Sequence, residues 1–194
     1  MLGDAFLVAP ILDATGKRDV ALPSGARWLD WWAPSQPARD GGTVLTSYDA
    51  SQGWHIPIFL RQGAIVPMNV SDDVTGMGTS ASAGHWTVLV VPPASGQSDF
   101  ALHEDDDSLT DITVSASAAS VEVSLSKASK PTILRVQLEQ APASIAQGTT
   151  ALPRQADRAQ LDAAATGWLW DKAAGAAWVK LPAASGAVGV QIVL

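Results

Sequence analysis

The chain has 194 residues, of which 47% are hydrophobic and 16% are charged, so its composition is that of a folded protein and not of a disordered tail. A net charge of −7 argues against nucleic acid and against an anionic membrane surface as partners. The absence of cysteine excludes disulfides and thiolate chemistry, and the short apolar runs predict no membrane-spanning helix.

Short extended runs separated by turn residues follow one another along the whole chain. Residues 121–126, 134–138 and 188–194 alternate apolar with polar side chains, a period of two that turns one set toward a core and the other toward water. Strands at this spacing, without helical patterns between them, predict an all-β fold of antiparallel β-sandwiches. Further extended runs are expected at residues 4–12, 19–22, 28–32, 43–46, 56–60, 64–66, 86–91, 99–103 and 177–181.

One stretch divides the chain, and another lacks the β pattern. Residues 69–84 are rich in Ser, Thr, Gly and Asp, which predicts a linker or a long exposed loop. We therefore expect one β-sandwich unit over residues 1–68 and a second over residues 85–194, both of ordinary domain size. Residues 154–165 lack alternation and are the one stretch compatible with a short helix.

The titratable residues form no recognisable catalytic, cofactor or metal motif. His55, His85 and His103 are far apart in the sequence and have no metal-ligand spacing. Residues 104–107 (EDDD) lack the alternating acids, central glycine and distal glutamate of a calcium loop, which favours a solvated turn over a cation site. Serine-nucleophile and phosphate-loop motifs are also absent. We expect no catalytic, cofactor-binding or metal-binding residue and no cofactor.

Eight tryptophans against one tyrosine and three phenylalanines are the most unusual feature of the composition. Strand alternation in residues 28–32 (WLDWW) places Trp28 and Trp32 on one face and Trp31 on the other. Indoles can stack on sugar rings, but they more often anchor cores and interfaces. Core packing is therefore the preferred interpretation, also for Trp168, Trp170 and Trp178, and sugar contact is the alternative.

Three segments, in order, resemble the region that follows the catalytic barrel in glycoside hydrolase family 31, which includes α-glucosidases and α-xylosidases. Residues 1–12 (MLGDAFLVAPIL) resemble its barrel-exit segment. Residues 22–25 (LPSG) with residues 28–32 resemble its "LPxGxWYDFW" strand pair, and residues 56–68 (IPIFLRQGAIVPM) resemble its "IPVFVRAGAIIPM" signature.

The second half of the chain resembles the distal C-terminal domain of that family more loosely. Residues 100–106 (FALHEDD) are similar to its "FxLYEDDG" strand, and residues 168–180 are similar to its last hairpin. His103 stands where tyrosine is usual, and Asp107 stands where the turn glycine is usual. Glycine tolerates a positive φ better than aspartate does, so the geometry of this turn is in question.

The resemblance implies that the working part of such an enzyme lies outside this chain. Members of the family retain anomeric configuration with two aspartates carried on a (β/α)8 barrel, and the "WxDMN" motif of the nucleophile is absent here. Trp28-Leu29-Asp30 begins like that motif but continues as Trp31-Trp32 and matches the sandwich motif instead. Residues 1–68 would then be the barrel-exit segment and proximal β-sandwich, and residues 85–194 the distal β-sandwich.

The expected function is non-catalytic support of the missing barrel, which would be the main partner and would lie upstream of Met1. This hypothesis predicts an exposed apolar patch that includes Leu2, Phe6 or some of residues 28–32. A stand-alone carbohydrate-binding module, with exposed tryptophans holding an oligosaccharide, is the alternative. A structural β-sandwich protein without a ligand is a third possibility.

Overall fold

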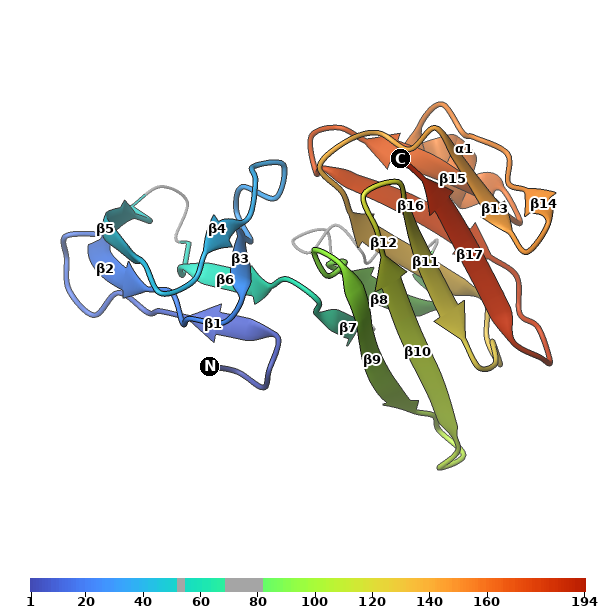
Figure 1. Ribbon diagram of the computed structural model, residues 1–194, viewed down its shortest axis with the longest axis horizontal. Helices are drawn as coiled ribbons and strands as arrows, with labels where there is room; N and C mark the ends of the chain where they lie inside the picture. Colours follow the sequence, from blue (N-terminus) through green and yellow to red (C-terminus); the bar gives the residue numbers. More distant parts are fainter. Residues whose placement is uncertain (52–54, 69–81) are drawn as a thin grey trace.

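The computed structural model describes residues 1–51, 55–68 and 82–194, which form two β-rich lobes lying side by side (Figure 1). The first lobe contains β1 (Phe6–Val8), β2 (Lys17–Ala21), β3 (Arg27–Asp30), β4 (Arg39–Asp40), β5 (Val44–Asp49) and β6 (Ile58–Arg61). The second lobe contains β7 (Ile65–Met68), β8 (Trp86–Val90), β9 (Gly96–His103), β10 (Leu109–Ala116), β11 (Ser120–Leu125), β12 (Thr132–Gln137), β13 (Ser144–Gln147), β14 (Thr150–Ala151), β15 (Gly167–Asp171), β16 (Ala176–Leu181) and β17 (Val188–Val193). The all-β prediction is confirmed.

The expected short helix is present as α1 (Arg158–Ala163). Asp157 caps its first turn, because the Asp157 carboxylate accepts a hydrogen bond from the backbone N–H of Gln160 at 2.9 Å. Within the described residues, no helix has the length and apolar character needed to cross a membrane.

The first lobe packs a four-stranded sheet of order β1-β6-β3-β4 against the two-stranded sheet β2-β5. Its core is small and centres on Trp28 and Phe59, which are almost fully buried. The Trp28 indole N–H donates to the carbonyl of Pro23 at 2.9 Å, so burial of this side chain leaves no unpaired donor. The ring of Tyr48 meets that of Phe59 edge-on at 5.4 Å.

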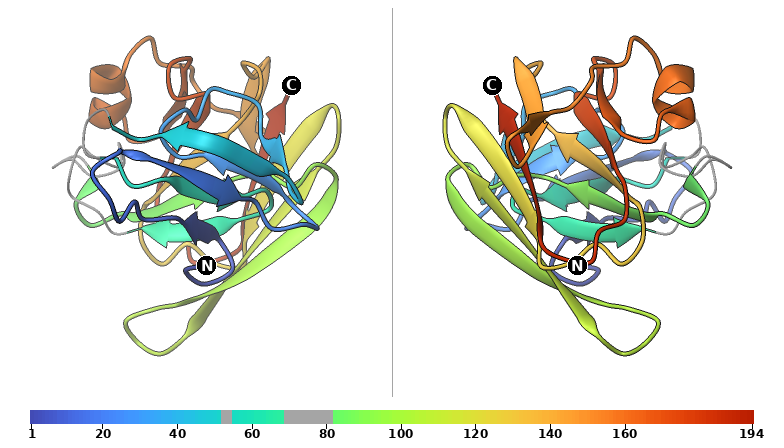
Figure 2. Two further views of the ribbon diagram at one scale, coloured as in Figure 1. Left: turned by 90° about the vertical axis from the view of Figure 1, so that its left-hand side faces the viewer. Right: turned by 90° about the vertical axis from the view of Figure 1, so that its right-hand side faces the viewer.

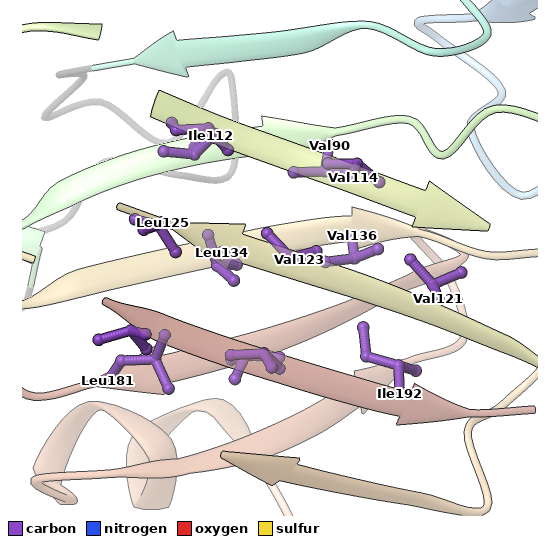
Figure 3. Packing of buried hydrophobic residues seen from close by; sticks show 14 of the residues in the cluster. Val90, Ile112, Val114, Val121, Val123, Leu125, Leu134, Val136, Leu181 and Ile192 are labelled. Carbon is purple, nitrogen blue, oxygen red and sulfur yellow. The ribbon is translucent and has the colours of Figure 1, made fainter. Parts of the chain in front are cut away.

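The second lobe is a sandwich of a six-stranded sheet, β14-β13-β17-β11-β10-β9, and a five-stranded sheet, β15-β16-β12-β8-β7. Alternate side chains from both sheets interdigitate between them, as Figure 3 shows for Val114 and Val123 on one sheet and Leu134 and Val136 on the other. The alternation read in residues 121–126, 134–138 and 188–194 therefore identified the core-facing positions of β11, β12 and β17.

One strand pair departs from the antiparallel prediction. β12 pairs with β16 in antiparallel fashion but with β8 in parallel, from Trp86 opposite Thr132 to Val90 opposite Val136. Between β8 and β12 the chain crosses to the six-stranded sheet and forms β9, β10 and β11 there. A crossover of this kind allows two strands of one sheet to run in the same direction. The five-stranded sheet is therefore mixed.

The chain passes from the first lobe to the second between β6 and β7. Ile65 pairs with Val90 and Met68 with Thr87, so β7 is the edge strand of the five-stranded sheet of the second lobe. The expected unit 1–68 thus includes one strand that is hydrogen-bonded to the other lobe. Of the expected linker at 69–84, residues 69–81 lie outside the described residues, and Ser82 and Gly84 form the turn that leads into β8.

Candidate functional site

The junction of the two lobes is a continuous apolar core. Leu29 and Leu60 of the first lobe pack in one cluster with residues on the outer face of the five-stranded sheet, and all of them are less than 9% exposed. These partners are Leu89, Val91, Ile133 and Trp178, together with Leu161 of α1. The five-stranded sheet is therefore covered on both faces, by the six-stranded sheet on one side and by α1 and the first lobe on the other.

Because the first lobe and α1 cover this face of the sheet, the polar side chains of β12 that point to it are shielded from water. Alternation turns Arg135 and Gln137 toward water, but Arg135 is half-buried and Gln137 is buried. The amide nitrogen of Gln137 donates to the carbonyl of Ala174 at 3.1 Å and to that of Pro34, across the junction, at 3.4 Å. The expectation that this face of β12 meets water was wrong because the first lobe covers it. The alternation of residues within one strand does not predict such a neighbour.

Gly175, in the turn between β15 and β16, lies against the first lobe. Its φ of +57° is left-handed, and a Cβ placed on it would be 3.0 Å from the Cα of Ser35 and 3.1 Å from the carbonyl oxygen of Pro34. The backbones of the two lobes therefore approach closely at this point, which a side chain would obstruct.

We expect Gly175→Ala to lower the free energy of unfolding by about 2 kcal/mol, from left-handed strain and from the contact with Pro34 and Ser35 together. Urea unfolding followed by circular dichroism measures the loss. Gly148→Ala is the matched control, because Gly148 has nearly the same φ, +56°, but nothing within 4 Å of its added Cβ. Equal losses in the two variants would contradict a tight junction.

The tryptophans are used mainly for packing. Trp28, Trp168 and Trp178 are at most 3% exposed, and Trp31, Trp32, Trp86 and Trp170 are half-buried, whereas Trp54 lies outside the described residues. Several indole faces carry a cation: Arg158 lies 4.2 Å and Arg135 5.4 Å from the ring centroid of Trp178, Arg154 lies 5.1 Å from that of Trp168, and Lys130 lies 4.6 Å from that of Trp86. The preferred interpretation is confirmed for the three buried rings.

Trp32 and His55 form a ring contact that the sequence did not predict. The two rings are stacked with centroids 3.9 Å apart and planes 2° from parallel, and the Trp32 indole N–H donates to the carbonyl of Ile56 at 2.7 Å. His55 thus covers an indole face that a sugar ring would need.

Large apolar side chains are exposed around the paired strands β1 and β6. Leu2 is 65% exposed, Leu12 is 92% exposed and Ile56 is 47% exposed, with Met1 beside them in the sequence. β1 is an edge strand. Met1 and Leu2 precede it in the sequence, Leu12 follows it, and Ile56 precedes β6. The left view of Figure 2 faces this lobe, with the N-terminus beside β1. We call these four residues the β1–β6 surface.

Of the alternatives named for the predicted apolar patch, Leu2 is exposed, whereas Phe6 and residues 28–32 are half-buried or buried. Phe6 is half-buried and packs against Trp31, with ring centroids 6.2 Å apart, and Trp28 lies in the core. These rings pack inward because they cover the small core and the junction, and the exposed apolar side chains are those of Met1, Leu2, Leu12 and Ile56 instead.

Asp30, in the segment that begins like a nucleophile motif, is buried by its own neighbours. Its carboxylate accepts hydrogen bonds from the Tyr48 hydroxyl at 2.8 Å and from the backbone N–H of Trp32 at 3.0 Å, and the residue is 5% exposed. Burial, and then the hydrogen bond to Asp30, raise the pKa of the Tyr48 hydroxyl. Its burial and these two hydrogen bonds give the Asp30 carboxylate a structural role in the first lobe.

The acidic run 104–107 is an organised turn between β9 and β10. The side chain of Glu104 is 6% exposed, accepts hydrogen bonds from the hydroxyls of Thr110 and Ser129, and lies 3.4 Å from the Lys127 ammonium. Asp107 adopts a φ of +62°, the left-handed conformation for which glycine is usual. The solvated-turn prediction was therefore wrong for Glu104, which ties the hairpin to the chain after β11. No group of three or more His, Cys, Asp or Glu residues that could hold a metal occurs among the described residues.

Replacing Glu104 by glutamine is expected to lower the free energy of unfolding at neutral pH by about 1–3 kcal/mol, because a buried charge-assisted network loses its acceptor charge. Burial raises the pKa of Glu104, but the bonds from Ser129 and Thr110 and the charge of Lys127 outweigh it and hold the pKa below 4.5. The contribution is thus present above about pH 4.5 and is lost as the pH falls below it.

Urea unfolding at several pH values measures this contribution, and the variant should show a flatter acid limb than the wild type. Asp105→Asn is the control, since the 2.6 Å contact of Asp105 with Lys130 is largely exposed and screened by solvent. A Glu104→Gln variant with an unchanged acid limb would contradict the proposed role of the carboxylate.

Comparison with known proteins explains this arrangement. Residues 1–66 match the family described as the glycosyl hydrolase family 31 C-terminal domain. Over its whole length the chain superimposes on the cycloalternan-forming enzyme from Listeria monocytogenes, solved with a pentasaccharide substrate, with a TM-score of 0.85 and 26% identity. Residues 1–66 thus match the C-terminal domain of glycosyl hydrolase family 31, and the whole chain is similar to part of the cycloalternan-forming enzyme.

Other proteins to which the chain is similar are much longer than it is. The 1,6-alpha-glucosyltransferase of Sporosarcina globispora is 32% identical over 107 residues, which cover 55% of this chain and 8% of that protein. The isomaltosyltransferase of the same organism is 26% identical over 201 residues, covering 99% of this chain and 18% of the relative. The cycloalternan-forming enzyme is likewise covered over only 18% of its length. A family 31 dextranase from Flavobacterium johnsoniae, 21% identical with a TM-score of 0.79, shares the fold.

Proposed function

We propose that this family 31 C-terminal region is non-catalytic and supports the (β/α)8 barrel of a retaining α-glycosidase or α-glucosyltransferase. The observation that carries the proposal is the β1–β6 surface, where apolar side chains are left in water although both sandwich cores are closed. The relatives' names, which include glucosyltransferases and an alpha-glucosidase from Bacillus thermoamyloliquefaciens, favour α-glucosides as the substrates of the parent protein. Hydrolysis and transfer can share the same covalent glycosyl-enzyme intermediate.

The apolar core of the junction gives this support a mechanical basis. Because Leu29 and Leu60 share one buried cluster with Leu89 and Trp178, the two lobes are held together by buried side chains, and full burial of an aliphatic side chain is worth about 1.5–3 kcal/mol. A barrel that contacts the first lobe would therefore be braced by both lobes.

A graft tests the support role. The C-terminal region of the Sporosarcina globispora isomaltosyltransferase is replaced by this chain, either unchanged or with Leu12→Asp and Ile56→Asp together. We expect the unchanged graft to keep a folded, active barrel and the double variant to lose several degrees of barrel melting temperature, because charge is placed in an apolar contact. The matched control is Leu109→Asp with Val193→Asp, two exposed apolar positions of the second lobe. Equal losses in the two double variants would contradict support through the β1–β6 surface.

The non-catalytic part of the proposal has its own assay. We expect the purified chain to show no hydrolysis of an aryl α-glucoside or α-xyloside above the buffer rate, because its one aspartate in a nucleophile-like setting, Asp30, is engaged with Tyr48 and Trp32. Turnover that a single Asp→Asn change abolishes would refute this part.

A further inference from the structure

A groove of about 560 Å³ lies where the two lobes meet, apart from the β1–β6 surface. The first lobe lines it with Arg27, Gln62 and the turn at residues 34–38, and the second lobe lines it with three turns, at residues 92–94, 116–118 and 138–140. Small-molecule sites occur preferentially at domain junctions and have volumes of roughly 300–1,000 Å³. The groove thus has the position and the size of a ligand site.

At this groove one cation, Arg27, is shared by two carboxylates. Arg27 lies 3.1 Å from Asp40 and 3.9 Å from Glu139 on the opposite lobe, and it also donates to the carbonyl of Ala38 at 2.6 Å. An anionic ligand would find no unpaired cation among these groups, and so the groove favours a neutral ligand over an anionic one.

Three carboxamides in the groove are available for hydrogen bonding. The side chains of Gln36, Gln62 and Gln140 make no hydrogen bond within the part of the chain that the structure describes, whereas Gln137 in the same groove is fully engaged. Each free carboxamide offers two N–H donors and one carbonyl acceptor. Such groups match vicinal hydroxyls, each of which both donates and accepts.

The remaining lining is mostly apolar. Pro34, Pro37, Pro92 and Pro93 line the groove, and among the described residues no tryptophan, tyrosine or phenylalanine does. Most of the lining comes from turns, so a peptide strand would find few backbone groups with which to pair. Amides beside small apolar surfaces suit a compact polyhydroxylated ligand better.

We propose that this groove binds a short, uncharged oligosaccharide. The site is separate from a tryptophan platform, because no indole of the described residues lines it, and it does not depend on the support role. It would hold a carbohydrate chain against the C-terminal region of the parent protein, away from any barrel contact on the β1–β6 surface.

Titration of the ¹⁵N-labelled chain with isomaltotriose or maltotriose, observed by NMR, tests the proposal. The side-chain amide signals of Gln36, Gln62 and Gln140 should shift at millimolar sugar, and tryptophan fluorescence should stay constant. Gln36→Ala with Gln140→Ala should weaken binding about tenfold, the effect of losing about two neutral hydrogen bonds. Gln191→Ala, an exposed glutamine of β17, is the matched control and should bind as the wild type does.

Three outcomes would overturn the proposal. One is the absence of shifts in these amides at tens of millimolar sugar. Another is quenching of tryptophan fluorescence without these shifts, which would place the sugar on an indole. The third is binding that the double glutamine variant leaves intact. A galacturonic acid trimer that binds as tightly as the neutral sugars would also contradict the charge argument.

Discussion

Trp178→Ala is expected to lower the free energy of unfolding by about 3–5 kcal/mol, the range for deleting a large buried ring. The indole is 3% exposed and packs in the junction cluster with Leu29 and Leu60 of the other lobe. Its removal also takes the ring away from the guanidinium groups of Arg135 and Arg158, which lie over it. The loss therefore combines a cavity with the loss of one cation–π contact at each of the two guanidinium groups.

Urea unfolding followed by circular dichroism measures the stability, and hydrogen exchange shows where it is lost. Because Trp178 joins the lobes, we expect faster exchange in β3 and β6 of the first lobe as well as in β16. Trp178→Phe should recover much of the stability, since it keeps an aromatic ring. Trp168→Ala is the control within the second lobe: Trp168 is equally buried but packs in the sandwich core. A Trp178→Ala loss below about 1 kcal/mol would contradict a tightly packed junction.

Asp30→Ala is expected to cost about 3 kcal/mol, because it leaves the buried Tyr48 hydroxyl and the Trp32 backbone N–H without their acceptor. Tyr48→Phe should cost less, since the Asp30 carboxylate keeps its bond from Trp32. Asp30→Asn should lie between the two, because the amide oxygen still accepts.

Thermal or urea unfolding of these variants, with Asp13→Ala as the control, measures the effect. Asp13 is exposed and, among the described residues, bonds only within its own turn, to Thr15, so its loss should leave stability nearly unchanged. An Asp30→Ala variant as stable as the wild type would leave the buried carboxylate without a structural role and would reopen a chemical one.

The strand alternation was informative wherever one face of a strand meets the core. It located β11, β12 and β17, but no run was predicted over β10 (Leu109–Ala116) or β13 (Ser144–Gln147). In β10 the buried residues Thr110, Ile112 and Val114 do alternate with polar ones, yet Thr110 and the neighbouring acidic turn obscure the pattern. The full extent of β10 is defined by its pairing with β9 in the structure.

The junction could not be predicted in the same way. Alternation distinguishes the two faces of β12 and β16, but it does not say whether a second layer covers the polar one. Lys180 is only 8% exposed and donates to the carbonyl of Asp162 at 2.7 Å, so a residue that reads as water-facing is part of the contact with α1. The stacking of His55 on Trp32 likewise joins residues that no spacing rule connects.

The arrangement of a proximal and a distal β-sandwich was predicted from the family resemblance of residues 1–12, 22–32 and 56–68. The local strand patterns did not predict this arrangement. The structure adds the physical reason for these three motifs. The tryptophans of the second motif build the core and the junction, and the first and third motifs form the β1–β6 pair that bears the exposed apolar side chains.

Hydrogen exchange on the graft, compared with the isolated chain, tests the support role most directly. If the first lobe carries a barrel, peptides that contain Leu2, Leu12 and Ile56 should exchange more slowly in the graft, while those of β9 and β10 should be unchanged. Protection confined to the second lobe, or no difference between the graft and the isolated chain, would contradict the proposed support through the β1–β6 surface.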